Sequence, residues 1–246
     1  MPTPAPIDDA GLDIPTRIGA LDWAGITASL DAHGFATTGP LLPPDACRAL
    51  ADLYDRPALF RSRIVMERHA FGRGEYQYFA DPLPAPVAAL RAAVYPHLAG
   101  VANRWAEALG EDARYPADLP DFLARCHAAG QTRPTPLLLR YGAGDYNCLH
   151  QDLYGPHVFP LQMAVLLDAP GHDFEGGEFV LVEQRPRAQS RAEVVPLRQG
   201  EAVVFAVRNR PVRGSRGWYR TTLRHGVATI RSGRRHTLGI LFHDAA

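Results

Sequence analysis

Apolar and polar positions follow two different periods along this chain of 246 residues. Through the first half, apolar residues recur three or four positions apart, the spacing that places them on one face of a helix. This pattern predicts helices over residues 21–34, 43–55, 85–110 and 117–130. Pro96 is expected to kink or divide the third of them. Between the helices, the alternating aromatic residues of 74–81 predict a strand.

The second half has a different pattern, because short runs rich in β-branched and aromatic residues are separated by Gly and Pro. Seven such runs predict strands at residues 135–141, 159–170, 176–184, 192–197, 201–207, 226–232 and 235–243. Short strands with turn signals between them are typical of a sandwich, jelly roll or barrel. We therefore expect an α+β protein in which mainly helical residues 16–134 pack on a β core of residues 135–246 as one functional unit. Residues 1–15 are expected to form a flexible Pro-rich tail.

Composition narrows the class of protein. Hydrophobic residues make up 46% of the chain, which is enough for a substantial core. No apolar run reaches the roughly eighteen residues that span a membrane, and the N-terminus has no basic region followed by an apolar stretch. The three cysteines show no paired spacing, which argues against a disulfide framework and a zinc knuckle. These features favour a cytoplasmic protein.

The charge is balanced overall but unevenly placed. All 26 basic residues are arginine, and residues 185–235 contain thirteen arginines but only two acids. Residues 208–224 carry six arginines, two aromatic residues and no acid. Because arginine binds phosphate and aromatic rings stack on bases, this segment predicts a contact with single-stranded or damaged nucleic acid. We expect this segment to be a loop that lies over the active site, and the residues expected to bind such a substrate are Arg213, Arg216, Trp218, Tyr219 and Arg220. The alternative is a solvated loop whose arginines pair with acids elsewhere.

The segment RYGAGDYNCLHQD, residues 140–152, ends in a histidine and an aspartate separated by one residue. In a strand, alternate residues point to the same face, so His150 and Asp152 are expected to project together. An imidazole and a carboxylate are two of the three ligands of the facial triad that holds non-haem Fe(II). The third ligand would be a distant histidine that the β core brings back to this pair.

Four motifs in order make the second half resemble the Fe(II)/2-oxoglutarate-dependent dioxygenases, whose fold is a double-stranded β-helix, or jelly roll. The motifs are RYGAGDYNCLHQD (140–152), FEGGEFVL (174–181), GEAVVF (200–205) and HGVATIRSGRRHTLGILF (225–242). The resemblance implies a jelly-roll core buttressed by the N-terminal helices and an enzyme that consumes O2. It also implies that His225 completes the Fe(II) site with His150 and Asp152. The other histidines near these motifs are expected to be structural or solvated, and they are His157, His172, His236 and His243.

The same resemblance implies 2-oxoglutarate as cosubstrate, and the far carboxylate of 2-oxoglutarate requires a cation. Arg234 and Arg235 are adjacent, so strand alternation places them on opposite faces. The face of Arg235 continues through Thr237 and a glycine, which leave room for a ligand, whereas the face of Arg234 continues through packing residues. We therefore expect Arg235 to bind the carboxylate. Tyr141 and Tyr146 are further candidates to hydrogen-bond the cosubstrate.

Further resemblances bear on the substrate. RYGAGDYNCLHQD is similar to the metal segment of the AlkB-type nucleic-acid demethylases, although the chain lacks that family's C-terminal Arg-x-Asn-x-Thr-x-Arg segment. The spacing of His225, Gly233 and Arg235 is similar to that of prolyl 4-hydroxylases. The whole chain resembles a prokaryotic oxygenase family thought to act on damaged nucleic acid. We expect oxidative removal of alkyl groups from such nucleic acid, a DNA-repair activity. The alternatives are prolyl or other protein hydroxylation, small-molecule hydroxylation, and a degenerate binding module without activity.

Overall fold

The computed structural model describes residues 12–246, and α-helices occupy much of its first half. Their bounds are α1 (Ile14–Gly19), α2 (Trp23–His33), α3 (Pro44–Ala51), α4 (Ala85–Ala108) and α5 (Leu119–Ala128). Short 3-10 helices follow at η2 (Asp52–Asp55), η3 (Pro57–Leu59) and η4 (Met66–His69). The four predicted helices are present as α2 to α5, and Pro96 lies inside α4 without dividing it. Among the described residues, no helix is long and apolar enough to cross a membrane.

The first described residues are part of the fold. The carboxylate of Asp13 accepts a hydrogen bond from the backbone N–H of Thr16 and so caps α1. Leu12 and Ile14 are buried in the main core. The predicted tail was therefore too long, because Leu12 and Ile14 pack in the core where α1 begins. Residues 1–11 of that tail lie outside the described residues.

The strands form two sheets in which every named pairing between strands is antiparallel. Their bounds are β1 (Phe35–Pro40), β2 (Phe60–Val65), β3 (Gly72–Arg73), β4 (Glu75–Phe79), β5 (Leu137–Gly142), β6 (Tyr146–His150), β7 (Leu161–Leu166), β8 (Phe174–Gly176), β9 (Phe179–Gln184), β10 (Arg191–Val195), β11 (Glu201–Ala206), β12 (Asn209–Gly214), β13 (Gly217–Val227) and β14 (Ile230–Ile240). The large sheet has the order β1-β11-β7-β14-β5-β4-β2, with β8 beside β14. The small sheet has the order β10-β9-β13-β6-β3, with β12 beside β13.

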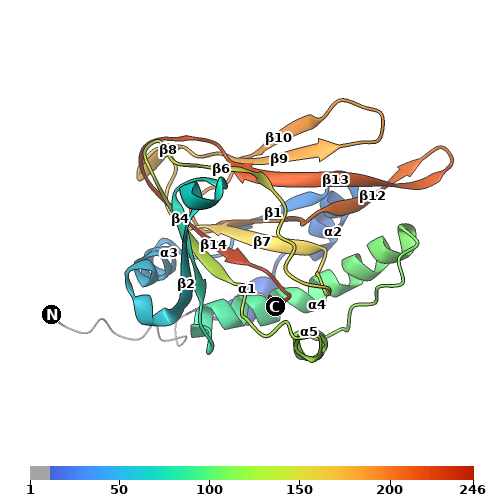
Figure 1. Cartoon of the computed structure of the whole chain (residues 1–246), viewed down its shortest axis with the longest axis horizontal. Coiled ribbons are helices and arrows are strands. Elements are labelled where there is room, and N and C mark those ends of the chain that lie inside the picture. The colour runs from blue at the N-terminus through green and yellow to red at the C-terminus, as the bar shows by residue number, and fades with distance from the viewer. Residues whose placement is uncertain (1–11) are drawn as a thin grey trace.

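The two sheets face each other, and helices cover the outer face of the large sheet (Figure 1). Alternation along each strand divides the two faces of that sheet. Leu138, Val165 and Leu238 point outward and join residues of α4 in the main hydrophobic cluster. Leu139 and Thr237 are one position away and line a cavity between the sheets. The outer face of the large sheet therefore packs in the main hydrophobic core, and its inner face lines the cavity in which a functional site could lie.

Two parts of the chain hold more strand than the sequence pattern predicted. The predicted strand at residues 74–81 is β4, but the N-terminal half also supplies β1, β2 and β3. Residues 208–224, expected to be a loop, instead form most of an antiparallel hairpin of β12 and β13. On β13 the exposed Arg220 and Arg224 alternate with the buried Thr221 and Leu223, so one side of this strand carries charge and the other packs. On β12, Arg213 is exposed, whereas Arg210 is buried and pairs with Glu183. The α+β class itself was predicted correctly.

Candidate active site

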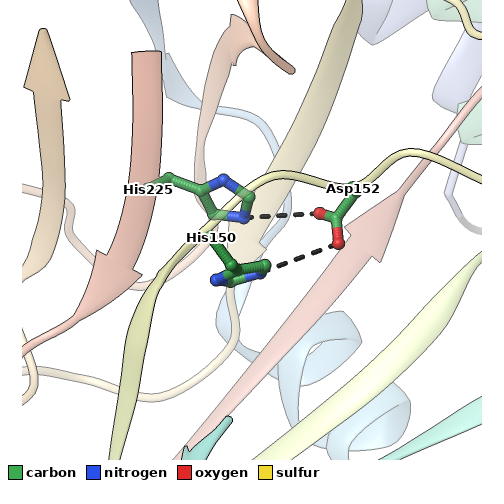
Figure 2. A group of neighbouring side chains, drawn as sticks. All are labelled: His150, Asp152 and His225. Atoms are coloured by element: carbon green, nitrogen blue, oxygen red, sulfur yellow. Dashed lines mark ion pairs between the residues drawn. The ribbon is translucent and has the colours of Figure 1, made fainter. Parts of the chain in front are cut away.

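The small sheet and the segment after β6 bring three candidate metal ligands together. His150 ends β6 and is paired directly with His225 of β13, so the two imidazoles lie side by side with ring centroids 4.1 Å apart. Asp152 lies just beyond β6, and its carboxylate faces both rings (Figure 2). Its oxygens lie 3.6 Å from His150 Nε2 and 3.4 Å from His225 Nε2.

This geometry fits one transition-metal ion. Two ligand atoms that are each about 2.1 Å from an ion stand roughly 3.0 Å apart at a right angle and farther apart at wider angles. The distances from the Asp152 carboxylate to His150 Nε2 and His225 Nε2, 3.6 Å and 3.4 Å, fall in this range. Within residues 12–246 these three residues are the one group of three or more His, Cys, Asp or Glu residues placed to hold a metal. The four other histidines named above are not part of it.

Hydrogen bonds and burial favour the protonation states in which these three side chains can bind a metal cation. His150 Nδ1 lies 2.8 Å from the carbonyl oxygen of Cys148, which can only accept, so Nδ1 carries the proton and Nε2 keeps its lone pair. Burial and the nearby His150 lower the pKa of His225, which favours its neutral, metal-binding form. Burial opposes the charge of Asp152, but the hydrogen bond with His225 outweighs it and holds the pKa of that carboxyl below its usual range.

The three residues open onto a cavity of about 230 Å³ between the two sheets. Strands β5, β7, β11 and β14 line it from the large sheet, and β6, β9 and β13 line it from the small sheet. Most of its wall is apolar, with Met163, Phe179, Phe205 and Leu241 among the lining residues. An apolar wall around a few polar groups is typical of small-molecule sites.

Arg235 is the buried cation of this cavity. Its side chain is only 2% exposed, and Nη1 donates to Thr237 Oγ1 over 2.5 Å. Its Nε has no hydrogen-bond partner, and within the described chain no acid forms an ion pair with it. The rings of Tyr141 and Phe174 lie 5.8 Å from the guanidinium carbon. A buried charge without an opposite charge is costly, so this guanidinium fits an anionic ligand such as a carboxylate.

The predicted division of faces along β14 is confirmed. Arg235, Thr237 and Gly239 line the cavity, whereas Arg234 is exposed on the other face. Tyr141 is fully buried beside Arg235, and burial raises the pKa of its hydroxyl above the usual value, so the hydroxyl stays protonated. Tyr146 is 37% exposed and does not line the cavity.

The predicted substrate residues of 208–224 lie elsewhere. Arg213 stacks over Trp218 with 5.3 Å between guanidinium carbon and ring centroid, and Arg220 forms an ion pair with Glu111 at 2.7 Å. None of the five predicted contact residues, Arg213, Arg216, Trp218, Tyr219 and Arg220, lines the cavity. Trp218 is seven residues from His225 on the same strand, or about 23 Å at roughly 3.3 Å per residue. The expectation that this segment hangs over the site was wrong, because β-pairing extends it away from the site (Figure 1).

Three side chains at the site were not selected from the sequence. The hydroxyl of Tyr154 donates to Asp152 Oδ1 over 2.7 Å. Tyr154 lies two residues after Asp152, so it continues the alternation of His150 and Asp152 and could have been selected from the sequence by the same reasoning. Gln162 is buried on β7 with Nε2 3.4 Å from His225 Nε2 and Oε1 unpartnered. Phe71 lines the cavity from an exposed turn. No motif pointed to either of these two residues.

A jelly-roll sandwich that encloses a His-Asp-His group beside a buried arginine defines an oxygenase-like site. Residues 74–245 match the model of the family Oxygenase-NA, which is described as "Oxygenase, catalysing oxidative methylation of damaged DNA". The chain belongs to this family and is an oxygenase. It is also 53% identical over 191 residues to an uncharacterized protein of Mycobacterium tuberculosis, found in two strains; the match covers 78% of this chain and 81% of the relative.

Solved structures show the same fold at low identity. A prolyl 4-hydroxylase from Pseudomonas putida matches with a TM-score of 0.54 and 16% identity, covering 88% of this chain and 96% of its own. The viral collagen prolyl hydroxylase of Paramecium Bursaria Chlorella virus-1, solved as a 2-oxoglutarate complex, has a TM-score of 0.50 and 16% identity, covering 85% of this chain and 95% of its own. The predicted jelly-roll core with helices packed on it is therefore confirmed.

Proposed function

We propose that this oxygenase is an Fe(II)- and 2-oxoglutarate-dependent dioxygenase that removes alkyl groups from damaged nucleic acid. The iron and cosubstrate assignment is carried by one observation: the His-Asp-His group and Arg235, a buried cation without an acid partner, share one cavity. The nucleic-acid assignment is supported by membership of a family described as acting on damaged DNA.

The polar residues of the cavity divide into two sets with different roles. His150, Asp152 and His225 would hold Fe(II) in the cavity that they line. When bound, Fe(II), 2-oxoglutarate and O2 convert a substrate C–H to C–OH, and 2-oxoglutarate leaves as succinate and CO2. Arg235 would bind the far carboxylate of 2-oxoglutarate, because a guanidinium offers two parallel N–H donors. The protonated hydroxyl of Tyr141 beside it is a second available donor.

The chemistry of an N-linked methyl group suits such a site. Hydroxylation of the methyl carbon gives a hemiaminal, which breaks down to formaldehyde and the unmodified base without further catalysis. The apolar wall would exclude water from the reacting carbon. A base can enter a cavity between two sheets only from a single strand or after it has been flipped out of a duplex. Single-stranded DNA carrying N-methylated bases is therefore the expected substrate.

Protein hydroxylation is the second candidate. It is supported by the likeness in fold to prolyl hydroxylases and by the spacing of His225, Gly233 and Arg235. The same metal and cosubstrate residues would serve both reactions, so these residues do not separate them. What differs is the group presented to the cavity, a methylated base or a peptide side chain.

The iron and cosubstrate assignment is tested by turnover of 2-oxoglutarate in the absence of substrate. The purified protein with Fe(II) should convert 2-oxoglutarate slowly to succinate, and Asp152→Ala should abolish the conversion. Glu175→Ala is a matched control, because Glu175 is exposed and does not line the cavity. Equal turnover by Asp152→Ala and the unaltered protein would remove Asp152 from the site.

The substrate is tested by supplying methylated oligonucleotides and proline-containing peptides in parallel. The proposal predicts formaldehyde from N-methylated single-stranded DNA and no hydroxylated peptide. Hydroxylated peptide without formaldehyde would instead support the second candidate function, protein hydroxylation. Both assays use the same Fe(II)-loaded protein, so a difference between them reflects the substrate alone.

A further inference from the structure

The cavity has an identifiable mouth. Of the residues that line it, Phe71 alone is exposed, with 47% of its surface accessible, while the others are buried or half-buried. Phe71 lies between η4 and β3, and β3 pairs with β6, the strand that ends at His150. A ligand that passes this residue therefore enters the cavity that the candidate metal ligands also line.

The segment around Phe71 is held firmly against β6. The backbone N–H of Phe71 donates to the carbonyl of Met66 over 3.1 Å, and the carbonyl of Phe71 accepts from the N–H of Cys148 over 2.9 Å. Met66 is fully buried and anchors the start of the segment. Gly72 follows at φ +126°, where an added Cβ would lie 2.4 Å from the carbonyl oxygen of Tyr146. Only glycine allows this close approach, so the exposed ring of Phe71 is presented on a fixed backbone.

Most of the exposed apolar side chains lie in the segment that contains Phe71 and in the segment that pairs with it. Among the described residues, six large hydrophobic side chains are exposed, and four of them lie in segments 66–73 and 146–153. These four are Phe71, Tyr146, Leu149 and Leu153. The two segments are joined by β3–β6 pairing, and the second contains the ligands His150 and Asp152. Exposed apolar residues grouped beside a cavity are typical of a binding surface.

Two arginines and a histidine accompany the apolar side chains. Arg68, His69 and Arg73 are exposed, and no ion pair within residues 12–246 includes Arg68 or Arg73. The imidazole of His69 stacks on the ring of Phe71 with centroids 5.3 Å apart and planes 24° from parallel. Glu67 is the single acid between residues 66 and 73. Stacking rings flanked by free arginines match the two parts of single-stranded nucleic acid, its bases and its phosphates.

We infer that residues 66–73, which we name the mouth segment, bind the nucleotide next to the one held in the cavity. The neighbouring base stacks on Phe71 and His69, and Arg68 and Arg73 contact the flanking phosphates. This inference rests on the proposed function and places the nucleic-acid contact at the cavity mouth. The β12–β13 hairpin has similar residues, but it projects toward the other side of the molecule in Figure 1, far from the teal turn of η4 beside β4.

The two surfaces are separated by matched variants of the full chain. Phe71→Ala and the double variant Arg68→Gln/Arg73→Gln alter the mouth segment. Trp218→Ala and Arg213→Gln/Arg216→Gln make the same changes in the hairpin. Affinity is measured with a fluorescent single-stranded oligonucleotide that carries one N-methylated base, over a series of salt concentrations. Thermal melting of each variant checks that it is folded, as expected because all six altered side chains are exposed.

The expected results differ between the two surfaces. Phe71→Ala should weaken binding by about 5- to 150-fold, the range for removal of one base–aromatic stack. The double arginine variant of the mouth should reduce the slope of log affinity against log salt by about 1.4, or roughly 0.7 for each phosphate that the protein no longer neutralises. Both hairpin variants should leave affinity and slope unchanged.

Other outcomes overturn the inference in distinguishable ways. Weakened binding in the hairpin variants, with the mouth variants unaffected, would reject the mouth segment while the proposed function stands. If the unaltered protein binds no oligonucleotide and hydroxylates peptide instead, the proposed function fails and the inference fails with it. Reduced peptide hydroxylation by Phe71→Ala would then assign the mouth to a protein substrate.

Discussion

Replacing Arg235 with methionine should weaken binding of the cosubstrate and also remove the destabilising effect of a buried charge. The guanidinium is 2% exposed, its Nε has no partner, and Thr237 accepts a hydrogen bond from its Nη1. Burial lowers the pKa of this arginine, which shows the same unfavourable surroundings for its charge. An uncompensated buried charge is destabilising, and an apolar side chain of similar volume removes that cost. The ligand-free Arg235→Met protein should therefore melt at the same temperature as the unaltered protein or higher.

The weakening of cosubstrate binding can be calculated from linkage. A charge-assisted hydrogen bond contributes about 1.5–3 kcal/mol, so the variant should bind 2-oxoglutarate roughly 10- to 150-fold more weakly. At a 2-oxoglutarate concentration 100 times its dissociation constant, the unaltered protein gains about 2.7 kcal/mol of stability. A 100-fold lower affinity reduces that gain to about 0.4 kcal/mol. For a chain of this length these values correspond to shifts in melting temperature of roughly 5–10 °C and about 1 °C.

The assay is thermal melting with and without 2-oxoglutarate, in the presence of Mn²⁺ as a redox-inactive substitute for Fe(II). Arg234→Met is the control, because Arg234 is adjacent in sequence but exposed on the opposite face. The control should keep the full shift. If Arg234→Met abolishes the shift and Arg235→Met keeps it, the assignment of the two faces of β14 to ligand and packing is refuted.

Three further predictions concern single side chains. Tyr154→Phe removes the donor to Asp152 and should weaken Mn²⁺ binding about tenfold in a calorimetric titration; unchanged affinity would show that the hydroxyl does not orient the carboxylate. Burial lowers the pKa of His243 to about 4 in the folded protein. Between pH 4 and about 6.5, the unfolded state therefore binds more protons than the folded state. The free energy of unfolding should fall as the pH drops through that window. His243→Gln should flatten part of that fall in urea titrations, and an identical pH profile would contradict the assignment. Gly233→Ala places a Cβ 2.0 Å from a backbone oxygen at φ +78°, and it should lower the melting temperature by several degrees; an unchanged melting temperature would contradict this reasoning.

The candidate metal ligands could be selected from the sequence in two ways, by the local spacing of His150 and Asp152 and by the resemblance of residues 225–242 to the dioxygenases. His150 and Asp152 are two residues apart, and His225 begins the one long motif at the end of the β core. The choice of Arg235 over Arg234 followed from strand alternation, which holds wherever a strand is regular. Core strands could be found for the same reason, since apolar runs buried on both faces stand out from their Gly and Pro boundaries.

The surroundings of the site were less predictable because they depend on pairing between distant segments. Phe71 reaches the cavity only because β3 pairs with β6, about 75 positions later in the chain, and β3 has two residues. The arginine-rich stretch 208–224 was interpreted by composition alone, whereas pairing of β12 with β13 decides where its side chains point. Gln162 lies in an apolar run, and its polar side chain gave no signal of its position next to His225.

The central claim is tested most directly by counting products. A single-stranded oligonucleotide with one N-methylated base is incubated with Fe(II), 2-oxoglutarate and the unaltered protein, and formaldehyde and succinate are measured together. After subtraction of turnover without oligonucleotide, we predict about one formaldehyde for each succinate, and neither product from Asp152→Ala. Succinate without formaldehyde above background, or formaldehyde from Asp152→Ala, would contradict the claim.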